Sequence, residues 1–167
     1  MGNNSKKCVF AGSFDPPTLG HKAVVEDCLQ MFDEVVLAVM VNPSKAPCFT
    51  VEERLEMLRL EYGKHSRVRV LAFQGTVAEL LEQENTKIYV RGIRSGTDLD
   101  FENANFYASK KLDKHLIAVY LPCRQELLHV SSSMVRNSLK FGTPYHEYVS
   151  EEVLQYIQAK RKSSICD

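Results

Sequence analysis

The chain has 167 residues, of which 44% are hydrophobic, and this is enough for one sizeable core and too little for two independent domains. Lysine plus arginine and aspartate plus glutamate both number 21, so the net charge is zero and no global field favours nucleic acid or an acidic membrane. The longest apolar run, Val35 to Val41, is far shorter than the ~20 residues that span a bilayer, and Met1 to Lys7 lacks a secretory apolar stretch. We therefore expect a cytoplasmic protein without nucleic-acid or membrane partners, built as one domain over residues 1–167 with polar tails at about 1–6 and 160–167.

Five short runs of β-branched and aliphatic residues predict buried strands. In chain order they are Cys8 to Ala11, Val35 to Val41, Val68 to Phe73, Ile88 to Val90 and Leu116 to Leu121. Helical patterns lie between them, and parallel strands need crossovers of this length. The alternation predicts an α/β fold of the Rossmann-like, doubly wound kind, with a five-stranded parallel sheet and helices on both faces. In such sheets ligands bind beyond the carboxyl ends of the strands, where the strand order reverses.

Two kinds of sequence feature predict helices: apolar residues at helical spacing, and capping boxes at the helix starts. One stripe comprises Val24, Val25, Cys28, Leu29 and Phe32, and a second comprises Val51, Leu55, Leu58 and Tyr62. Two capping boxes, Thr50-x-x-Glu53 and Thr76-x-x-Glu79, predict helix starts because each side chain can satisfy an otherwise unpaired backbone donor. These boxes support the boundaries of the helices and say nothing of function.

The cysteines suggest neither disulfides nor a metal site. They are five in number and scattered along the chain, at Cys8, Cys28, Cys48, Cys123 and Cys166. No C-x-x-C pair indicates zinc or redox chemistry. We expect free thiols without a catalytic role, and no metal ligands among the side chains.

The strongest chemical signal follows the first predicted strand, in the string from Gly12 to His21, which reads GSFDPPTLGH. Gly12 and Gly20 remove side-chain bulk where a backbone approaches a ligand, and the two prolines restrict the turn between them. His21 falls in the first turn of a helix, where free N–H groups and the helix dipole favour phosphate. The loop alone would also suit an ordinary tight turn with Thr18 as a cap.

The string resembles the T-x-G-H signature of the nucleotidyltransferase superfamily, in the form found in bacterial phosphopantetheine adenylyltransferases. Three further segments resemble that family in the same order: Asn42 to Lys45 with Phe49 to Arg54, Arg91 to Arg94 with Asp98 and the Phe101-Glu102 pair, and Val130 to Arg136. The resemblance implies transfer of AMP from ATP to 4′-phosphopantetheine, which gives dephospho-coenzyme A and pyrophosphate. Such a reaction depends on positioning and on charge stabilisation, and it needs no covalent nucleophile.

Site residues follow from the same resemblance, position by position. The catalytic group comprises His21, Ser13, Lys45 and Arg94. Phosphopantetheine is expected at Ser13, Lys45, Thr76, Val77 and Arg91. ATP is expected at Ser13, Phe14, His21, Gly92, Ile93, Arg94, Glu102, Leu127, Leu128, His129, Val130, Ser131, Ser132 and Ser133. Mg²⁺ is expected with ATP because it usually accompanies ATP phosphates and needs few protein ligands. The family also implies a homo-hexamer and coenzyme A as an inhibitor.

Two other kinds of protein remain as alternatives. A nicotinate or nicotinamide mononucleotide adenylyltransferase would share the fold and a similar first loop, although its signature usually has histidine where Thr18 stands. A non-catalytic nucleotide or coenzyme A sensor could keep the binding backbone and dispense with His21. Retention of Ser13, His21, Lys45, Arg91 and Arg94 together favours an enzyme.

Overall fold

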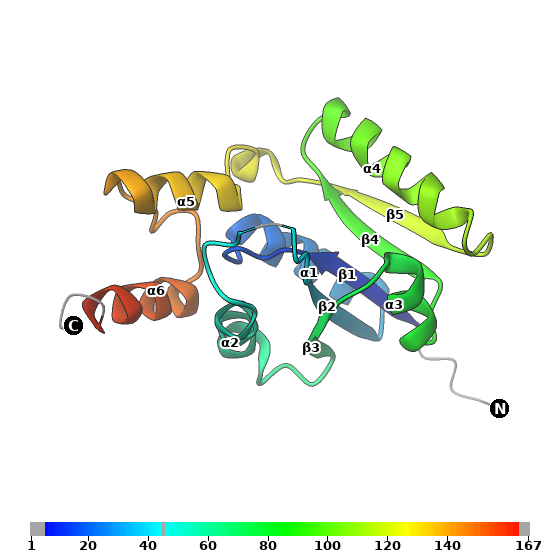
Figure 1. Cartoon of the computed structure of the whole chain (residues 1–167), viewed down its shortest axis with the longest axis horizontal. Coiled ribbons are helices and arrows are strands. Elements are labelled where there is room, and N and C mark those ends of the chain that lie inside the picture. Colours follow the sequence, from blue (N-terminus) through cyan, green and yellow to red (C-terminus); the bar gives the residue numbers. More distant parts are fainter. Residues whose placement is uncertain (1–5, 45, 164–167) are drawn as a thin grey trace.

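The computed structural model describes residues 6–44 and 46–163, and these form a sheet with helices on both faces and a helical extension (Figure 1). The strands are β1 (Lys7–Gly12), β2 (Glu34–Met40), β3 (Val68–Phe73), β4 (Ile88–Ile93) and β5 (Ile117–Pro122). The helices are α1 (Leu19–Met31), α2 (Val51–Tyr62), α3 (Val77–Gln83), α4 (Gly96–Lys110), α5 (Ser132–Phe141) and α6 (Glu151–Ser163), with a 3-10 turn at Gln125–Leu127.

The sheet confirms the predicted architecture. Its strands follow the order β3-β2-β1-β4-β5, and every neighbouring pair is parallel. The chain moves outward from β1 to β3 and then returns to the other side of β1 with β4. The strand order therefore reverses between β1 and β4, where Val9 pairs with Tyr89 and Phe10 with Val90. A ligand crevice is expected beyond the carboxyl ends of these two strands.

Each face of the sheet carries its own apolar cluster, because alternate side chains of a strand point to opposite faces. Cys8, Phe10 and Leu37 pack beneath α1 and α2, in the cluster that also contains both predicted helical stripes. Val9 and Ala38 pack on the other face, against Ala78, Leu80 and Leu81 of α3 and Phe106 of α4. The two clusters confirm helices on both faces.

A third cluster joins the last two helices to α2, outside the sheet. Phe49 and Met57 are buried against Val135 of α5 and against Val153 and Ile157 of α6. In Figure 1, α5 and α6 extend away from the sheet at one end of the molecule. This packing ties the end of the described chain to the segment that precedes α2.

Three local features differ from the sequence-based expectations. Strand β4 continues past Val90 to Ile93, because these residues pair with Tyr120 to Pro122 of β5. The edge strands β3 and β5 are half-buried at most positions rather than fully buried. The tail expected from residue 160 is also wrong in part, since α6 runs to Ser163. There the ammonium group of Lys160 lies 5.2 Å from the centre of the Phe49 ring.

The expected helix starts are present, with both capping boxes formed. Thr50 Oγ1 accepts a hydrogen bond from the N–H of Glu53, and Thr76 Oγ1 accepts one from the N–H of Glu79, each at 3.2 Å.

Within residues 6–44 and 46–163, none of the helices combines the length and the apolarity that crossing a membrane would require.

Candidate active site

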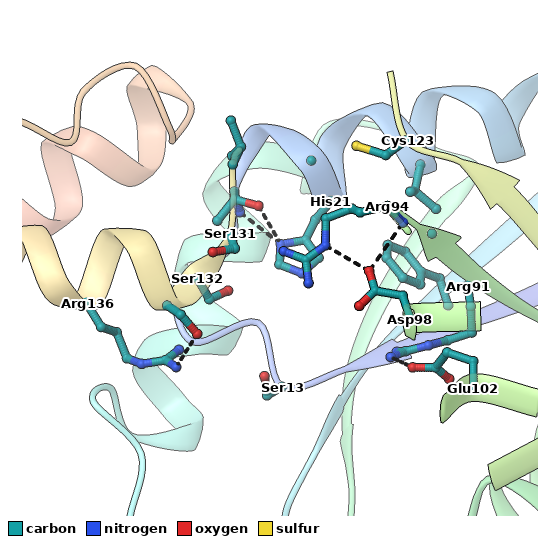
Figure 2. Close-up of a pocket in the computed structure, with 17 residues that line it drawn as sticks. Ser13, His21, Arg91, Arg94, Asp98, Glu102, Cys123, Ser131, Ser132 and Arg136 are labelled. Carbon is teal, nitrogen blue, oxygen red and sulfur yellow. Dashed lines mark hydrogen bonds and ion pairs between the residues drawn. The ribbon is translucent and has the colours of Figure 1, made fainter. Parts of the chain in front are cut away.

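A pocket of about 280 Å³ opens where β1 and β4 end, at the expected reversal of strand order (Figure 2). Its walls come from the β1–α1 loop, the end of β4, the start of α4 and the first turn of α5. The lining residues are Phe10, Ser13, Thr18, Gly20, His21, Val24, Arg91, Gly92, Arg94, Asp98, Glu102, Cys123, Val130, Ser131, Ser132, Ser133 and Arg136. Three of these carry a guanidinium group, so the pocket suits a polyanion.

The loop that carries Ser13 is held through its carbonyl groups by distant helices. Arg54 of α2, which is only 4% exposed, donates from Nη1 to the Ser13 carbonyl oxygen at 2.8 Å. Arg136 of α5 donates from Nη1 to the Asp15 oxygen at 2.7 Å, and Ser132 Oγ donates to the Pro16 oxygen at 2.8 Å. Because these carbonyl oxygens are occupied, their partial negative charge is offset beside a site for phosphate.

The imidazole of His21 is held in one tautomer. The N–H of Thr18 donates to His21 Nδ1 at 3.0 Å, and the hydroxyl of Thr18 is also 3.0 Å from Nδ1. Burial, and then the positive charges of Arg91 and Arg94, lower the pKa of His21 to about 4. The ring is therefore neutral near pH 7, with its proton on Nε2, and Nε2–H is available as a donor to a phosphate oxygen.

The Phe14 ring packs against the imidazole of His21. Its side chain is 1% exposed, and its ring centre lies 4.9 Å from that of His21 and 5.4 Å from that of Phe10. Its φ of 47° is in the left-handed region, which non-glycine residues seldom adopt. Phe14 thus packs against the imidazole instead of facing the pocket, which differs from the ATP contact expected from the resemblance.

The two arginines of the R-G-x-R element are each oriented by acceptors of the protein. Arg91 donates to the Ala11 carbonyl oxygen at 2.6 Å and pairs with Glu102 of α4, which is 8% exposed. Arg91 Nε is buried and has no partner among the described residues. Arg94 donates from its main-chain N–H and from Nε to Oδ2 of Asp98, at 3.2 and 3.1 Å. In Figure 2 Asp98 lies on one side of His21, and Ser131 lies on the other.

Each of the three serines at the start of α5 already has a partner within the protein. Ser131 is the N-cap and accepts from the N–H of Met134 at 3.2 Å, and Ser132 donates to Pro16. Ser133 Oγ accepts from Nη2 of Arg136 at 3.0 Å. The hydroxyls of Ser131 and Ser133 can still donate, and the unpaired N–H groups of the first turn of α5 add further donors beside the pocket.

The structure brings ten of the expected site residues to this pocket: Ser13, His21, Arg91, Gly92, Arg94, Glu102, Val130, Ser131, Ser132 and Ser133. Five expected ATP contacts do not line it: Phe14, Ile93, Leu127, Leu128 and His129. Thr76 and Val77 start α3 elsewhere, with the Thr76 hydroxyl in its capping box and Val77 packed on the sheet. Lys45 lies outside the described residues.

Several lining residues were not among the expected contacts. Asp98 and Arg136 belong to the matched segments, so the sequence held a signal for both. Cys123 follows β5 and has no such signal. Burial raises the pKa of its thiol, which therefore stays protonated near pH 7. Gly92 is required for packing, because a Cβ atom there would lie 2.7 Å from Cγ2 of Val24 in α1.

Comparison with known proteins places these residues in a family. The cytidylyltransferase-like family model matches residues 9–138. A phosphopantetheine adenylyltransferase of Symbiobacterium thermophilum is 44% identical over 83% of this chain and 85% of its own length. That of Heliobacterium modesticaldum is 36% identical over 91% of this chain and 90% of its own length. The chain belongs to the phosphopantetheine adenylyltransferase family.

A solved structure has the same fold as this member of the phosphopantetheine adenylyltransferase family. A crystal structure described as a nicotinate-nucleotide adenylyltransferase from Vibrio parahaemolyticus matches with a TM-score of 0.72 over 93% of both chains, at 23% identity. This likeness supports the fold and does not bear on the substrate. The chain is accordingly an enzyme of the nucleotidyltransferase class, with the pocket at the carboxyl ends of β1 and β4 as its candidate active site.

Proposed function

We propose that the protein transfers AMP from ATP to the phosphate of 4′-phosphopantetheine, and so makes dephospho-coenzyme A and pyrophosphate. The observation that carries this proposal is the neutral, tautomer-fixed His21, which shares one pocket with Arg91, Arg94 and the start of α5. The family relatives named above support the same reaction.

In this reaction a phosphate oxygen of phosphopantetheine attacks the α-phosphorus of ATP. A new P–O bond forms as the bond from the α-phosphorus to the bridging oxygen breaks, and pyrophosphate leaves with the electron pair. Negative charge grows on the equatorial and leaving oxygens. His21 Nε2–H would donate to an α-phosphate oxygen, and Arg94 would neutralise the adjacent charge. The first turn of α5 would receive the leaving pyrophosphate.

The acceptor substrate would bind at the part of the pocket that Ser13 and Arg91 line. Lys45 and Arg91 would hold its phosphate, with Ser13 between the two substrates. The unpaired Nε of Arg91 supports this assignment, because a buried donor without a partner favours an incoming acceptor. Thr76 and Val77 would contact the pantetheine arm at the start of α3, beyond the pocket that holds ATP.

Magnesium would enter with ATP as part of the substrate. Mg²⁺ retains several waters and takes one or two carboxylates together with phosphate oxygens. Asp98 offers such a carboxylate at the pocket wall, because only its Oδ2 is engaged by Arg94. In this role the ion would offset charge on the phosphates, while the side chains set their positions. We place the reaction in the cytoplasm, where ATP is supplied.

Assembly into a homo-hexamer with coenzyme A as an inhibitor completes the proposal. Three large apolar side chains on and just beyond α4 are exposed, Phe101 at 66%, Tyr107 at 63% and Leu112 at 67%. Exposed side chains of this size and kind support association with further copies of the chain.

A substrate panel tests the proposal. Purified protein with MgATP should release pyrophosphate when phosphopantetheine is added, and far less with nicotinamide or nicotinate mononucleotide. Product analysis should show dephospho-coenzyme A. Turnover of a pyridine mononucleotide with none of phosphopantetheine would establish the alternative enzyme. Tight binding of both substrates without any turnover would favour a sensor.

A further inference from the structure

Arg54 of α2 is a buried cation without an anionic partner in the described chain. It is 4% exposed, and within residues 6–44 and 46–163 its guanidinium forms no ion pair with a carboxylate. Nη1 donates to the Ser13 carbonyl oxygen at 2.8 Å, and Nε donates to the Thr50 carbonyl oxygen at 3.3 Å. Both acceptors are neutral. A buried charge costs much free energy unless an opposite charge offsets it, so the charge of Arg54 is available to an incoming anion.

Asp15 is the buried carboxylate of the same β1–α1 loop, and it does not pair with Arg54. Its Oδ2 accepts the N–H of Cys48 at 2.9 Å, and its Oδ1 accepts the N–H of Phe49 at 2.8 Å. The carboxylate thus holds the backbone of the segment that leads into α2. The guanidinium of Arg54 is left to the Ser13 carbonyl.

The peptide group between Ser13 and Phe14 connects Arg54 to the pocket. This peptide is trans, so its C=O and N–H point in opposite directions. Because the C=O faces Arg54, the N–H of Phe14 points away from Arg54. Among the described residues this N–H has no hydrogen-bond partner, and the adjacent Ser13 lines the pocket. The Phe14 N–H, unlike the Phe14 ring, is therefore a free donor beside the Ser13 hydroxyl.

We propose that Arg54 is a positioning residue that orients and polarises the Ser13–Phe14 peptide as a donor to a phosphate group of ATP. A cation that donates to a carbonyl oxygen draws electron density from the peptide, which strengthens its N–H as a donor. The charge of Arg54 also acts directly, because electrostatic interactions are stronger in the interior than in water. The inference rests on the proposed function in taking ATP as the ligand of this pocket.

Such a role predicts a difference between charged and neutral ligands that a purely structural residue would not produce. ATP and adenosine share the base and the ribose, and only ATP has phosphate oxygens for the Ser13–Phe14 peptide. Damage to the fold of the pocket weakens both ligands alike. Loss of a phosphate donor weakens ATP and leaves adenosine as it was.

The test uses Arg54→Met, which keeps an unbranched side chain and removes the charge and the donors. ATP, measured by calorimetry with Mg²⁺, should bind about tenfold more weakly, since a hydrogen bond to a charged group has about this worth. Adenosine, measured by ligand-observed NMR in the same buffer, should stay within about threefold of the parent, because it offers the peptide no phosphate. Circular dichroism checks that the variant is folded at the assay temperature.

Arg59→Met is the matched control, because it removes the same charge from the same helix. Arg59 is half exposed, pairs with Glu56 and does not line the pocket. Its ratio of ATP affinity to adenosine affinity should equal that of the parent.

Arg54→Lys tests the idea if Arg54→Met does not fold. A buried lysine loses its proton at lower pH than a free one, whereas arginine stays charged. Between about pH 7 and 9.5 the preference of Arg54→Lys for ATP over adenosine should therefore fall with rising pH by about tenfold. The parent, whose ATP phosphates are already fully ionised over most of this range, should show a constant preference.

The outcomes separate this inference from the proposed function. Equal weakening of ATP and adenosine in Arg54→Met, or a preference of Arg54→Lys that does not change with pH, overturns the role of Arg54. Unchanged ATP affinity with weakened phosphopantetheine also overturns it, because the peptide would then serve the other substrate. A parent that binds ATP but neither binds nor turns over phosphopantetheine overturns the proposed function, while the ATP and adenosine affinities still decide the role of Arg54.

Discussion

The two ends of the sheet carry similar charged residues and use them differently. At the amino end, Lys7 and Arg69 pair with Glu34 and with Glu84, the C-cap of α3, which is 6% exposed. At the carboxyl end, Arg91 and Arg94 also pair with carboxylates, Glu102 and Asp98, but the guanidinium groups of Arg54 and Arg136 donate to backbone carbonyls. There Arg91 Nε has no partner among the described residues.

The difference shows how one fold separates stability from chemistry. At the amino end two cations face two carboxylates, so little positive field is left for a ligand. At the carboxyl end Arg136 lines the pocket and donates to a neutral carbonyl, so its charge is not matched by a carboxylate and the pocket retains a local positive field in a chain with zero net charge. Substitutions at the two ends should therefore have different effects.

The largest effect is expected from His21→Ala at the carboxyl end. If Nε2–H stabilises charge that grows in the transition state, kcat and kcat/KM should fall together by about 10² to 10³, by analogy with the loss of one oxyanion donor. ATP affinity should change little. Single-turnover rates and calorimetric dissociation constants measure the two quantities separately.

His65→Ala provides the control for this variant, because His65 is exposed, does not line the pocket and is not among the expected substrate contacts. Its rate should match that of the parent. A near-normal rate for His21→Ala combined with strongly weakened ATP binding would make His21 a ground-state contact. That result would contradict the idea that side chains at the carboxyl end of the sheet serve catalysis while those at the amino end serve stability.

Glu84→Gln at the amino end is expected to lower stability and to leave the rate unchanged, whereas His21→Ala lowers the rate. The change leaves Arg69 and Lys7 without a buried carboxylate and should cost about 1 to 3 kcal/mol of unfolding free energy. Each kcal/mol lowers Tm by about 2 to 4 °C in a chain of this size. The kinetic constants should stay as in the parent. Glu82→Gln, at an exposed position of the same helix, should leave Tm unchanged, and a loss of kcat in Glu84→Gln would contradict the separation.

The last expected effect concerns pH. His21 has a pKa of about 4 in the folded protein against 6.5 as a free group, so the unfolded chain binds more protons between these values. The contribution of His21 to stability is therefore complete above pH 6.5 and is lost as pH falls toward 4. Denaturant titrations of the parent and of His21→Gln should diverge over this range. Parallel curves would show that His21 is not desolvated.

The sequence predicts the sheet well because its signal is local. The apolar runs identify all five strands, and the capping boxes at Thr50 and Thr76 identify two helix starts. The end of β4 is hidden because Arg91 and Gly92 do not resemble strand residues. Gly92 is present for its close approach to Val24, which is a tertiary contact that no local pattern reveals.

The sequence predicts many of the residues that line the candidate site, but it does not predict the hydrogen bonds that hold them in place. Family motifs indicate ten residues that the pocket brings together. The same motifs assign Phe14 to ATP, although it packs behind His21. The roles of Arg54, Asp15 and Arg136 depend on partners 33 to 121 residues away, so they follow only from the folded chain.

These separations also determine when the site can exist during synthesis. A growing chain acquires all five strands by Pro122, but Ser132 and Arg136, which hold the β1–α1 loop, come later, and their partners lie 116 and 121 residues before them. The main-chain N–H of Leu19 donates to the Tyr148 carbonyl, which emerges later still. Because synthesis proceeds from the amino terminus, all five strands leave the ribosome before the β1–α1 loop has its partners. A domain generally folds as a unit, so a chain that stops before Arg136 has the residues of the sheet and lacks those that complete the nucleotide pocket.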